Sequence, residues 1–180
     1  MHSSKTQVWD LFVRLFHWSL AIGILIAWLS SKDASTFHMN VGYICAALVL
    51  ARCIWGFIGS RYARFTHFVR RPAAVLTYLN RILDKREDRY IGHNPAGGAM
   101  VLALISLVAM TAASGWMLNT DTFWGVLWVQ QMHFIFAICI CLLVVLHVSG
   151  VLLASSRHSE NLIWAMITGK KRPAEPGDVA

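Results

Sequence analysis

Two histidines, His133 and His147, lie fourteen residues apart on a long apolar stretch with no charged residue between His133 and Arg157. On an α-helix this separation is about 3.9 turns and roughly 21 Å of rise. The two imidazoles would therefore point to nearly the same face of one helix, at opposite depths of a bilayer whose apolar core is about 30 Å thick. One such helix could supply a ligand to each of two cofactors stacked across a membrane.

The composition places the whole chain in a membrane, since 57% of its residues are hydrophobic and 14% are charged. A membrane-spanning helix satisfies its own backbone hydrogen bonds, and four segments are long and apolar enough to be one. They are Leu11–Ser30, Met39–Gly59, Ala96–Met117 and Val129–Ser155. We therefore predict an all-α integral membrane protein, a four-transmembrane-helix bundle that forms a single domain over residues 1–172. We expect a disordered tail over 173–180.

The first span is expected to be retained, because Trp28-Leu29-Ser30 is a poor signal-peptide cleavage site. Two shorter segments predict helices that lie at the membrane surface. Pro72 followed by Ala73–Leu83 predicts an interfacial helix in the cytoplasmic loop, and Glu160–Thr168 predicts another near the C-terminus that stops at Gly169.

The basic residues indicate the orientation. The loop between the second and third spans holds eight of them, whereas the two other connections hold one, Lys32. Both termini and the long loop should therefore be cytoplasmic. We therefore interpret the net charge of +7 as an indication of membrane topology. The basic residues also favour contact with membrane lipid. We expect no nucleic-acid partner, because no soluble basic face is evident.

Four histidines fall at two depths of the predicted bundle. His17 and His147 lie near the inner ends of the first and fourth spans, and His38 and His133 lie near the outer starts of the second and fourth. Neutral imidazole ligates haem iron well, and a pair of axial histidines suits electron transfer because no position stays open for substrate. The pattern predicts two haem b groups. The alternative is that each histidine only forms hydrogen bonds in the bundle or at its surface.

Small residues follow each of these histidines by three or four positions, and so share its helix face. They are Ala21, Gly42, Ala137 and Gly150. A flat macrocycle needs a flat wall of this kind, although close helix packing alone would also favour small residues.

Two arginines are candidate partners for haem propionates. Arg52 lies within the apolar segment 48–55 of the second span, fourteen residues after His38, so it should lie on the His38 face near the inner haem. Arg14 lies one turn before His17. A cation inside the membrane is costly unless it is paired, and a propionate of the inner haem would pair with it. The alternative is that the side chain snorkels to the cytoplasmic headgroups.

The remaining histidines, His67 and His93 in the inner loop and His2 and His158 near the termini, are interpreted as solvated or interfacial residues. His93 could also contact a propionate or a quinone headgroup. The chain has no Cys-x-x-Cys-His motif, so covalent attachment of haem is not expected.

At this point the chain resembles a known family. Phe16-His17-Trp18 in the first span, His38 opening the second, and His133 with His147 in the fourth resemble the bacterial cytochrome b561 family. That family includes the b-type subunits of membrane nickel–iron hydrogenases, and the segments 55–65 and 158–162 are similar to this branch. The resemblance extends from about Val8 to Lys171.

The resemblance implies two b haems, ligated by His17 with His147 and by His38 with His133, in a bacterial inner membrane. It also implies electron exchange between the quinone pool and a redox partner, such as a periplasmic c-type cytochrome or a larger oxidoreductase. We therefore expect a dihaem electron carrier. Quinone is its candidate substrate, quinol/quinone oxidoreductase activity is left open, and a homodimer is one candidate assembly.

Two alternatives stay open: a His-lined proton or metal-ion transporter, and a non-redox assembly subunit. The chain lacks intramembrane carboxylates to share the transported ions. An absorption spectrum of the purified protein would separate these readings.

Overall fold

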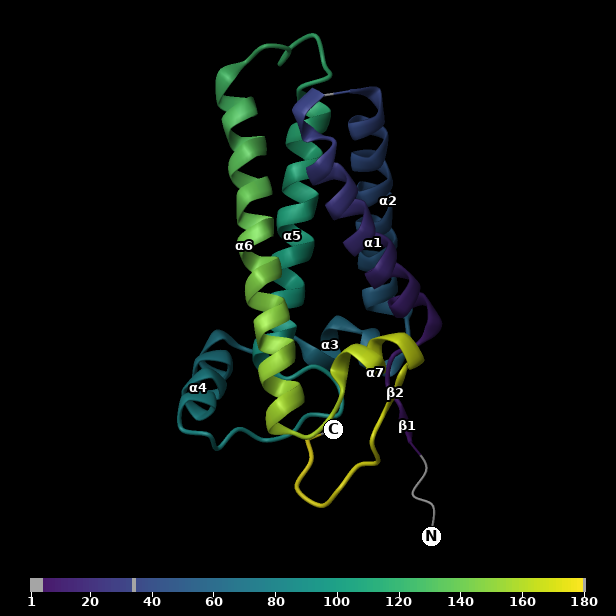
Figure 1. The fold of residues 1–180 in the computed structure, drawn as a ribbon, viewed down its shortest axis with the longest axis vertical. Coiled ribbons are helices and arrows are strands. Elements are labelled where there is room, and N and C mark those ends of the chain that lie inside the picture. Colours follow the sequence, from purple (N-terminus) through teal and green to yellow (C-terminus); the bar gives the residue numbers. More distant parts are fainter. Residues whose placement is uncertain (1–4, 34, 180) are drawn as a thin grey trace. The chain divides into compact units, whose positions relative to one another are not determined.

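The computed structural model describes residues 5–33 and 35–179 (Figure 1), so His2 lies outside the described residues. Four long helices dominate it, and each is long and apolar enough to cross a membrane. They are α1 (Leu11–Leu29), α2 (Thr36–Ile58), α5 (Pro95–Met117) and α6 (Leu127–Arg157). These helices match the four predicted spans to within a few residues at either end. The predicted fold class is therefore confirmed.

The shorter elements lie between and after the spans. They are β1 (Thr6–Gln7), η1 (Ser31–Asp33), η2 (Arg61–Ala63), α3 (Phe65–Phe68), α4 (Pro72–Leu83), α7 (Leu162–Thr168) and β2 (Lys170–Lys171). Helices α4 and α7 are the two predicted short helices. Helix α7 begins at Leu162 because the Asn161 side chain accepts a hydrogen bond from the Trp164 amide at 2.8 Å, which makes Asn161 its N-cap.

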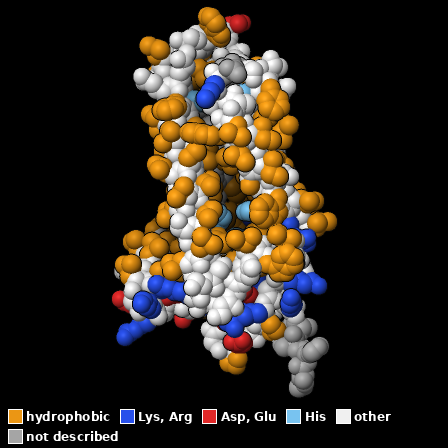
Figure 2. All heavy atoms as spheres, in the orientation of Figure 1, with side chains coloured by type: hydrophobic (Ala, Val, Ile, Leu, Met, Phe, Trp, Pro, Cys, Tyr) orange, Lys and Arg blue, Asp and Glu red, His pale blue; other side chains and the backbone are white. Residues whose placement is uncertain are grey.

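Side-chain type follows this division of the chain. In the most apolar 18-residue stretch of each span, at most 28% of the stretch is buried. Most of the apolar surface of each span therefore faces outward, as it would toward lipid. Figure 2 shows hydrophobic side chains over the long helices, whereas most Lys, Arg, Asp and Glu side chains gather over the elements around α4 and α7.

The chain divides into two compact units, and each is described by itself. Unit 1 comprises Met1–Arg14, Ile54–Leu102 and Leu146–Ala180, of which residues 1–4 and 180 lie outside the described part. Unit 2 comprises Leu15–Cys53 and Ala103–Val145. The predicted single membrane domain over residues 1–172 stays a prediction.

Asp10 ties the start of α1 to the end of α2 within unit 1. Its carboxylate accepts a hydrogen bond from the Val13 amide at 2.8 Å, as the N-cap of α1. The same side chain accepts hydrogen bonds from the Trp55 indole at 3.1 Å and from the Ser60 hydroxyl. A buried hydrophobic cluster lies among these segments and forms the core of the unit. Its members are Val8, Trp9, Val13, Ala63, Ile91 and Ala165.

Gly169 brings the two ends of unit 1 together. It ends α7 in the left-handed conformation, with φ of 81°, and its carbonyl accepts hydrogen bonds from the Val8 and Trp9 amides at 2.9 and 3.0 Å. A Cβ at this position would lie 2.5 Å from the Trp9 carbonyl oxygen, so only glycine fits. The predicted stop at Gly169 is confirmed, and it lets β1 pair with β2 in antiparallel register.

We expected the tail over 173–180 to be disordered. The structure instead shows specific contacts for this segment up to residue 179. The Arg89 guanidinium donates to Glu160 at 3.0 Å and to the carbonyls of Arg172 and Pro173, and it also forms an ion pair with Asp178. Val179 exchanges backbone hydrogen bonds with Arg89 and Ile91 at 2.9 Å. The acidic, Pro- and Gly-containing tail looks solvated in sequence, but its carboxylate pairs with a buried cation of a loop far away in the chain.

Candidate haem site

His38 and His133 lie close together in unit 2. His38 sits in the first turns of α2 and His133 in the first turns of α6, and their ring centroids are 6.2 Å apart at an interplanar angle of 75°. The structure thus brings together the two histidines that sequence depth assigns to the outer pair.

The tautomer of His38 follows from its hydrogen bond. Its Nδ1 lies 2.9 Å from the carbonyl oxygen of Ala27, on α1, and 3.4 Å from the Ser30 hydroxyl. A carbonyl oxygen only accepts, so Nδ1 carries the proton and donates it. The lone pair then lies on Nε2, the nitrogen that would ligate a metal. Hydrogen bonds of this kind fix the orientation of ligating histidines.

His133 is held in the same way by α5. Its Nδ1 donates to the Thr111 carbonyl at 3.0 Å and lies 3.2 Å from the hydroxyl of Ser114, a buried residue. Helix α5 comes so close that a Cβ on Gly115 would lie 3.0 Å from Cε1 of His133. Sequence reasoning missed these three residues. The signal that could have found them is a small, polar Thr-x-x-Ser-Gly patch inside an otherwise apolar span.

The pair fits a haem iron by its chemistry and spacing. Two imidazoles that both carry the proton on Nδ1 offer two neutral nitrogens. The 6.2 Å between their ring centroids is compatible with both imidazoles serving as ligands of one iron. Over residues 5–33 and 35–179, no three His, Cys, Asp or Glu residues group as ligands of a bare metal ion.

Two of the glycines that follow candidate ligands have open space beside them, which a macrocycle could occupy. A Cβ built on Gly42, four residues after His38, would meet no atom within 4 Å. The same holds for Gly150, three residues after His147. Gly23 and Gly115 differ, because a Cβ there would lie 2.8 Å from Cys45 Sγ and 3.0 Å from His133 respectively. Close helix packing therefore explains Gly23 and Gly115 but not Gly42 and Gly150.

The predicted inner pair falls in different units, His17 in unit 2 and His147 in unit 1. Each side chain is partly buried. The His17 ring contacts Trp18 edge-on, with centroids 5.1 Å apart. The pairing of His17 with His147 stays a prediction.

The two candidate propionate partners are both removed from solvent to some degree. The Arg52 residue is only 2% exposed, which disfavours a snorkelling side chain that reaches the headgroup layer. Arg14 is partly buried, and its Nε is buried with no hydrogen-bond partner among the described residues. A buried donor of this kind suits an anionic group. The roles of both residues stay predictions.

Two further histidines, His67 and His93, pack against aromatic rings of unit 1. His93 lies between Trp9 and Phe68, with ring centroids 4.6 and 4.7 Å away, and His67 contacts Tyr62 at 5.1 Å. Burial, together with the charges of neighbouring arginines, lowers the pKa of His67 below its ordinary value. His67 is therefore a neutral packing residue at neutral pH.

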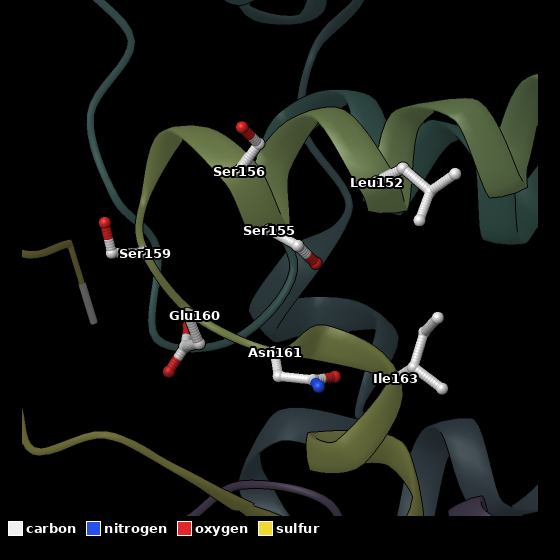
Figure 3. A pocket seen from close by; sticks show the side chains of 7 residues that line it. All are labelled: Leu152, Ser155, Ser156, Ser159, Glu160, Asn161 and Ile163. Atoms are coloured by element: carbon white, nitrogen blue, oxygen red, sulfur yellow. The ribbon is translucent and has the colours of Figure 1, made fainter.

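A shallow pocket of about 420 Å³ lies where α6 turns into α7 (Figure 3). Its lining mixes serines with apolar side chains: Leu152, Ser155, Ser156, Ser159, Glu160, Asn161 and Ile163. Several of its polar groups serve the turn itself. The Ser155 hydroxyl accepts from the Leu162 amide, Asn161 caps α7, and Glu160 pairs with Arg89. The pocket contains none of the histidines discussed above.

Four helices long and apolar enough to span a membrane, with two neighbouring histidines on two of them, are typical of the helical membrane cytochromes. Comparison with known proteins agrees, because a family model described as prokaryotic cytochrome b561 matches residues 8–169. The chain belongs to this family of b-type cytochromes, which hold haem b. The family resemblance predicted from the sequence is thereby confirmed.

The curated relatives also support the predicted branch. A probable Ni/Fe-hydrogenase B-type cytochrome subunit of Azotobacter vinelandii is 29% identical over 123 residues, which cover 52% of this chain and 50% of that protein. A protein of the same description from Rhodobacter capsulatus is 22% identical over 216 residues, covering 93% of this chain and 82% of the relative. The chain spans about half the length of the Azotobacter relatives that it matches. No solved structure matches it significantly.

Proposed function

We propose that this chain is a dihaem b-type cytochrome that carries electrons across the bacterial inner membrane, between the quinone pool and a redox protein. The observation that carries the proposal is the His38–His133 pair, with its 6.2 Å ring separation and both Nδ1 atoms held by backbone carbonyls. Haem b held by His38 and His133 would supply one-electron chemistry, and the two histidines would leave no ligand position free for substrate.

The chain's own residues divide the work of holding the two groups. His38 and His133 would ligate the outer haem through Nε2, and the Ala27 and Thr111 carbonyls would keep both rings in the ligating orientation. His17 and His147 would ligate the inner haem. Arg52 and Arg14 would neutralise propionates, which relieves the cost of a buried cation. Gly42 and Gly150 would let a macrocycle lie flat against α2 and α6.

The redox partner is proposed from the relatives. Proteins named Ni/Fe-hydrogenase B-type cytochrome subunits are similar to this chain, so a membrane-bound redox enzyme such as a hydrogenase is a candidate partner. A periplasmic c-type cytochrome is the other candidate. Both termini and the loop that carries α4 would face the cytoplasm, because the basic residues concentrate there.

Single alanine substitutions of the four histidines, followed by redox titration of each purified variant, test the ligand pairs. His38→Ala and His133→Ala should perturb one spectral component, and His17→Ala and His147→Ala the other. Variants with partial haem occupancy are informative, since loss of one haem can loosen a bundle this small. If His17→Ala and His133→Ala removed the same component, the assignment of pairs by depth would be wrong.

A further inference from the structure

Helix α4 carries an apolar stripe that the fold leaves exposed. Leu76, Leu79 and Leu83 are 63%, 43% and 79% exposed. At 100° per residue these three positions, with Pro72, fall within about 60° of one another on the helix. A soluble protein seldom exposes such a row of leucines on one helix without a use for it.

The stripe is distinct from the face by which α4 packs. Tyr78 is buried, and Val75 and Ile82 on the same side are partly buried. This packing face is centred about 100° from the leucine stripe around the helix axis. The Tyr78 ring contacts Tyr90 edge-on at 5.6 Å, and burial raises the pKa of its hydroxyl to about 12, so it stays neutral. Packing within unit 1 therefore does not account for the leucines.

Contacts within unit 1 place α4 at the level where a membrane span ends. Arg157, the last residue of α6, donates to the Ile82 carbonyl at 2.6 Å and to the Glu87 carboxylate at 2.8 and 2.9 Å. Figure 1 shows α4 beside this end of α6. Because α6 is a candidate membrane span, a helix fixed to its last residue lies at the depth of the lipid headgroups.

Basic residues frame the stripe at both ends of the helix. Arg70 and Arg71 precede α4, and Lys85 and Arg86 follow it, and all four are exposed. None of the four forms an ion pair within the part of the chain that the structure describes. In Figure 2, hydrophobic and basic side chains lie next to one another over α4. An apolar stripe between unpaired cations complements acyl chains below anionic headgroups.

The turn after α4 keeps one of these cations in place at a conformational cost. The Lys85 amide donates to Ile82 and the Arg86 amide to Arg81, the two bonds of a Schellman motif. The residue in the left-handed position, with φ of 59°, is Lys85, although glycine would be favoured there. The chain thus retains a positive charge beside Leu83 at a position where backbone geometry alone would select glycine.

We propose that α4 is a docking surface for anionic phospholipid, with Leu76, Leu79 and Leu83 inserted among the acyl chains. Arg70, Arg71, Lys85 and Arg86 contact the lipid phosphates. The helix anchors the long inner loop to the membrane surface, independently of the ligation of haem.

The test measures how fast a water-soluble maleimide reacts with single cysteines on the full chain, reconstituted at one copy per lipid nanodisc. Leu79→Cys reports the stripe, and Thr77→Cys, an exposed position about 160° around the same helix, is the matched control. The unsubstituted chain gives the background of the four native cysteines, which lie on α2 and α6. Leu76→Cys, at another exposed leucine, is a second stripe reporter in case Leu79→Cys perturbs the helix.

In discs with about a third phosphatidylglycerol, the stripe cysteines should react roughly tenfold or more slowly than the control. This protection should weaken several-fold in pure phosphatidylcholine, and likewise in a variant with Arg70→Gln, Arg71→Gln, Lys85→Asn and Arg86→Gln. Equal reaction of stripe and control cysteines in the anionic discs would overturn the proposal. So would protection that appears only when a disc holds two copies, which would assign the stripe to a contact between chains. If protection were equal in both lipids and unchanged by the four substitutions, the proposed preference of the helix for anionic lipid would be wrong.

Discussion

Gly42 offers a sharp test of the outer haem, because a methyl group there should have opposite effects on the polypeptide and on cofactor binding. In the polypeptide, a Cβ at this position meets nothing within 4 Å. Replacing a mid-helix glycine by alanine should then stabilise the haem-free chain by about 0.5–1 kcal/mol. If a macrocycle packs against this face, the same methyl overpacks it at a cost of about 1–3 kcal/mol. That cost corresponds to haem affinity weakened about 5- to 150-fold.

The assay combines two measurements on Gly42→Ala in detergent: denaturant unfolding of the haem-free chain, and haem titration followed by the absorption spectrum. The component that weakens should be the one lost in His38→Ala. Gly150→Ala is the matched counterpart on α6, and it should weaken the component lost in His147→Ala. Wild-type haem affinity in Gly42→Ala would refute the reasoning, because it would mean that no bound group occupies that face.

Three further results are expected. Arg89→Met should destabilise the chain by about 3–5 kcal/mol in an unfolding titration, since buried Asp178 loses its cation and buried Glu160 keeps only the more distant Lys171, at 3.8 Å. Arg81→Met, which breaks an exposed pair, should cost less than about 1 kcal/mol, and equal costs would contradict the buried cluster. Arg52→Leu should lower the reduction potential of the inner haem, because a nearby positive charge favours the reduced state; an unchanged titration would leave Arg52 without that role. Because the pKa of His67 is lowered in the folded chain, the unfolded chain binds more protons as the pH falls below the ordinary value of 6.5. Stability should therefore decrease as the pH falls through that region, and His67→Gln should remove this part of the slope.

The membrane-spanning architecture could be predicted because its signals are local. An uninterrupted apolar run such as the one after His133 specifies a span whatever the rest of the chain does. Pro72 and Gly169 likewise mark helix ends through their own backbone geometry. The closeness of His38 and His133 in the structure could be expected from depth, since the two spans set the height of each residue.

The parts that sequence reasoning missed depend on contacts between distant segments. Ser114 lies 3.2 Å from His133 on another helix. The small, polar patch around Ser114 could have marked it, but the patch alone does not indicate which histidine it contacts. In the sequence, Arg89 looks like the other basic residues of the long loop. In the structure, its side chain is buried and forms an ion pair with Asp178 of the tail. Such a contact joins segments about ninety residues apart, and neither segment shows it by itself. The tail was for this reason expected to be solvated.

The number of haems per chain tests the central claim most directly. If two histidine pairs hold the groups without covalent attachment, the purified full chain should be red, should show sharp α-bands on reduction, and should release its haem into acidified organic solvent. Haem quantified against protein should give a ratio near two. A ratio near one, or haem that stays attached to the chain after extraction, would contradict the account.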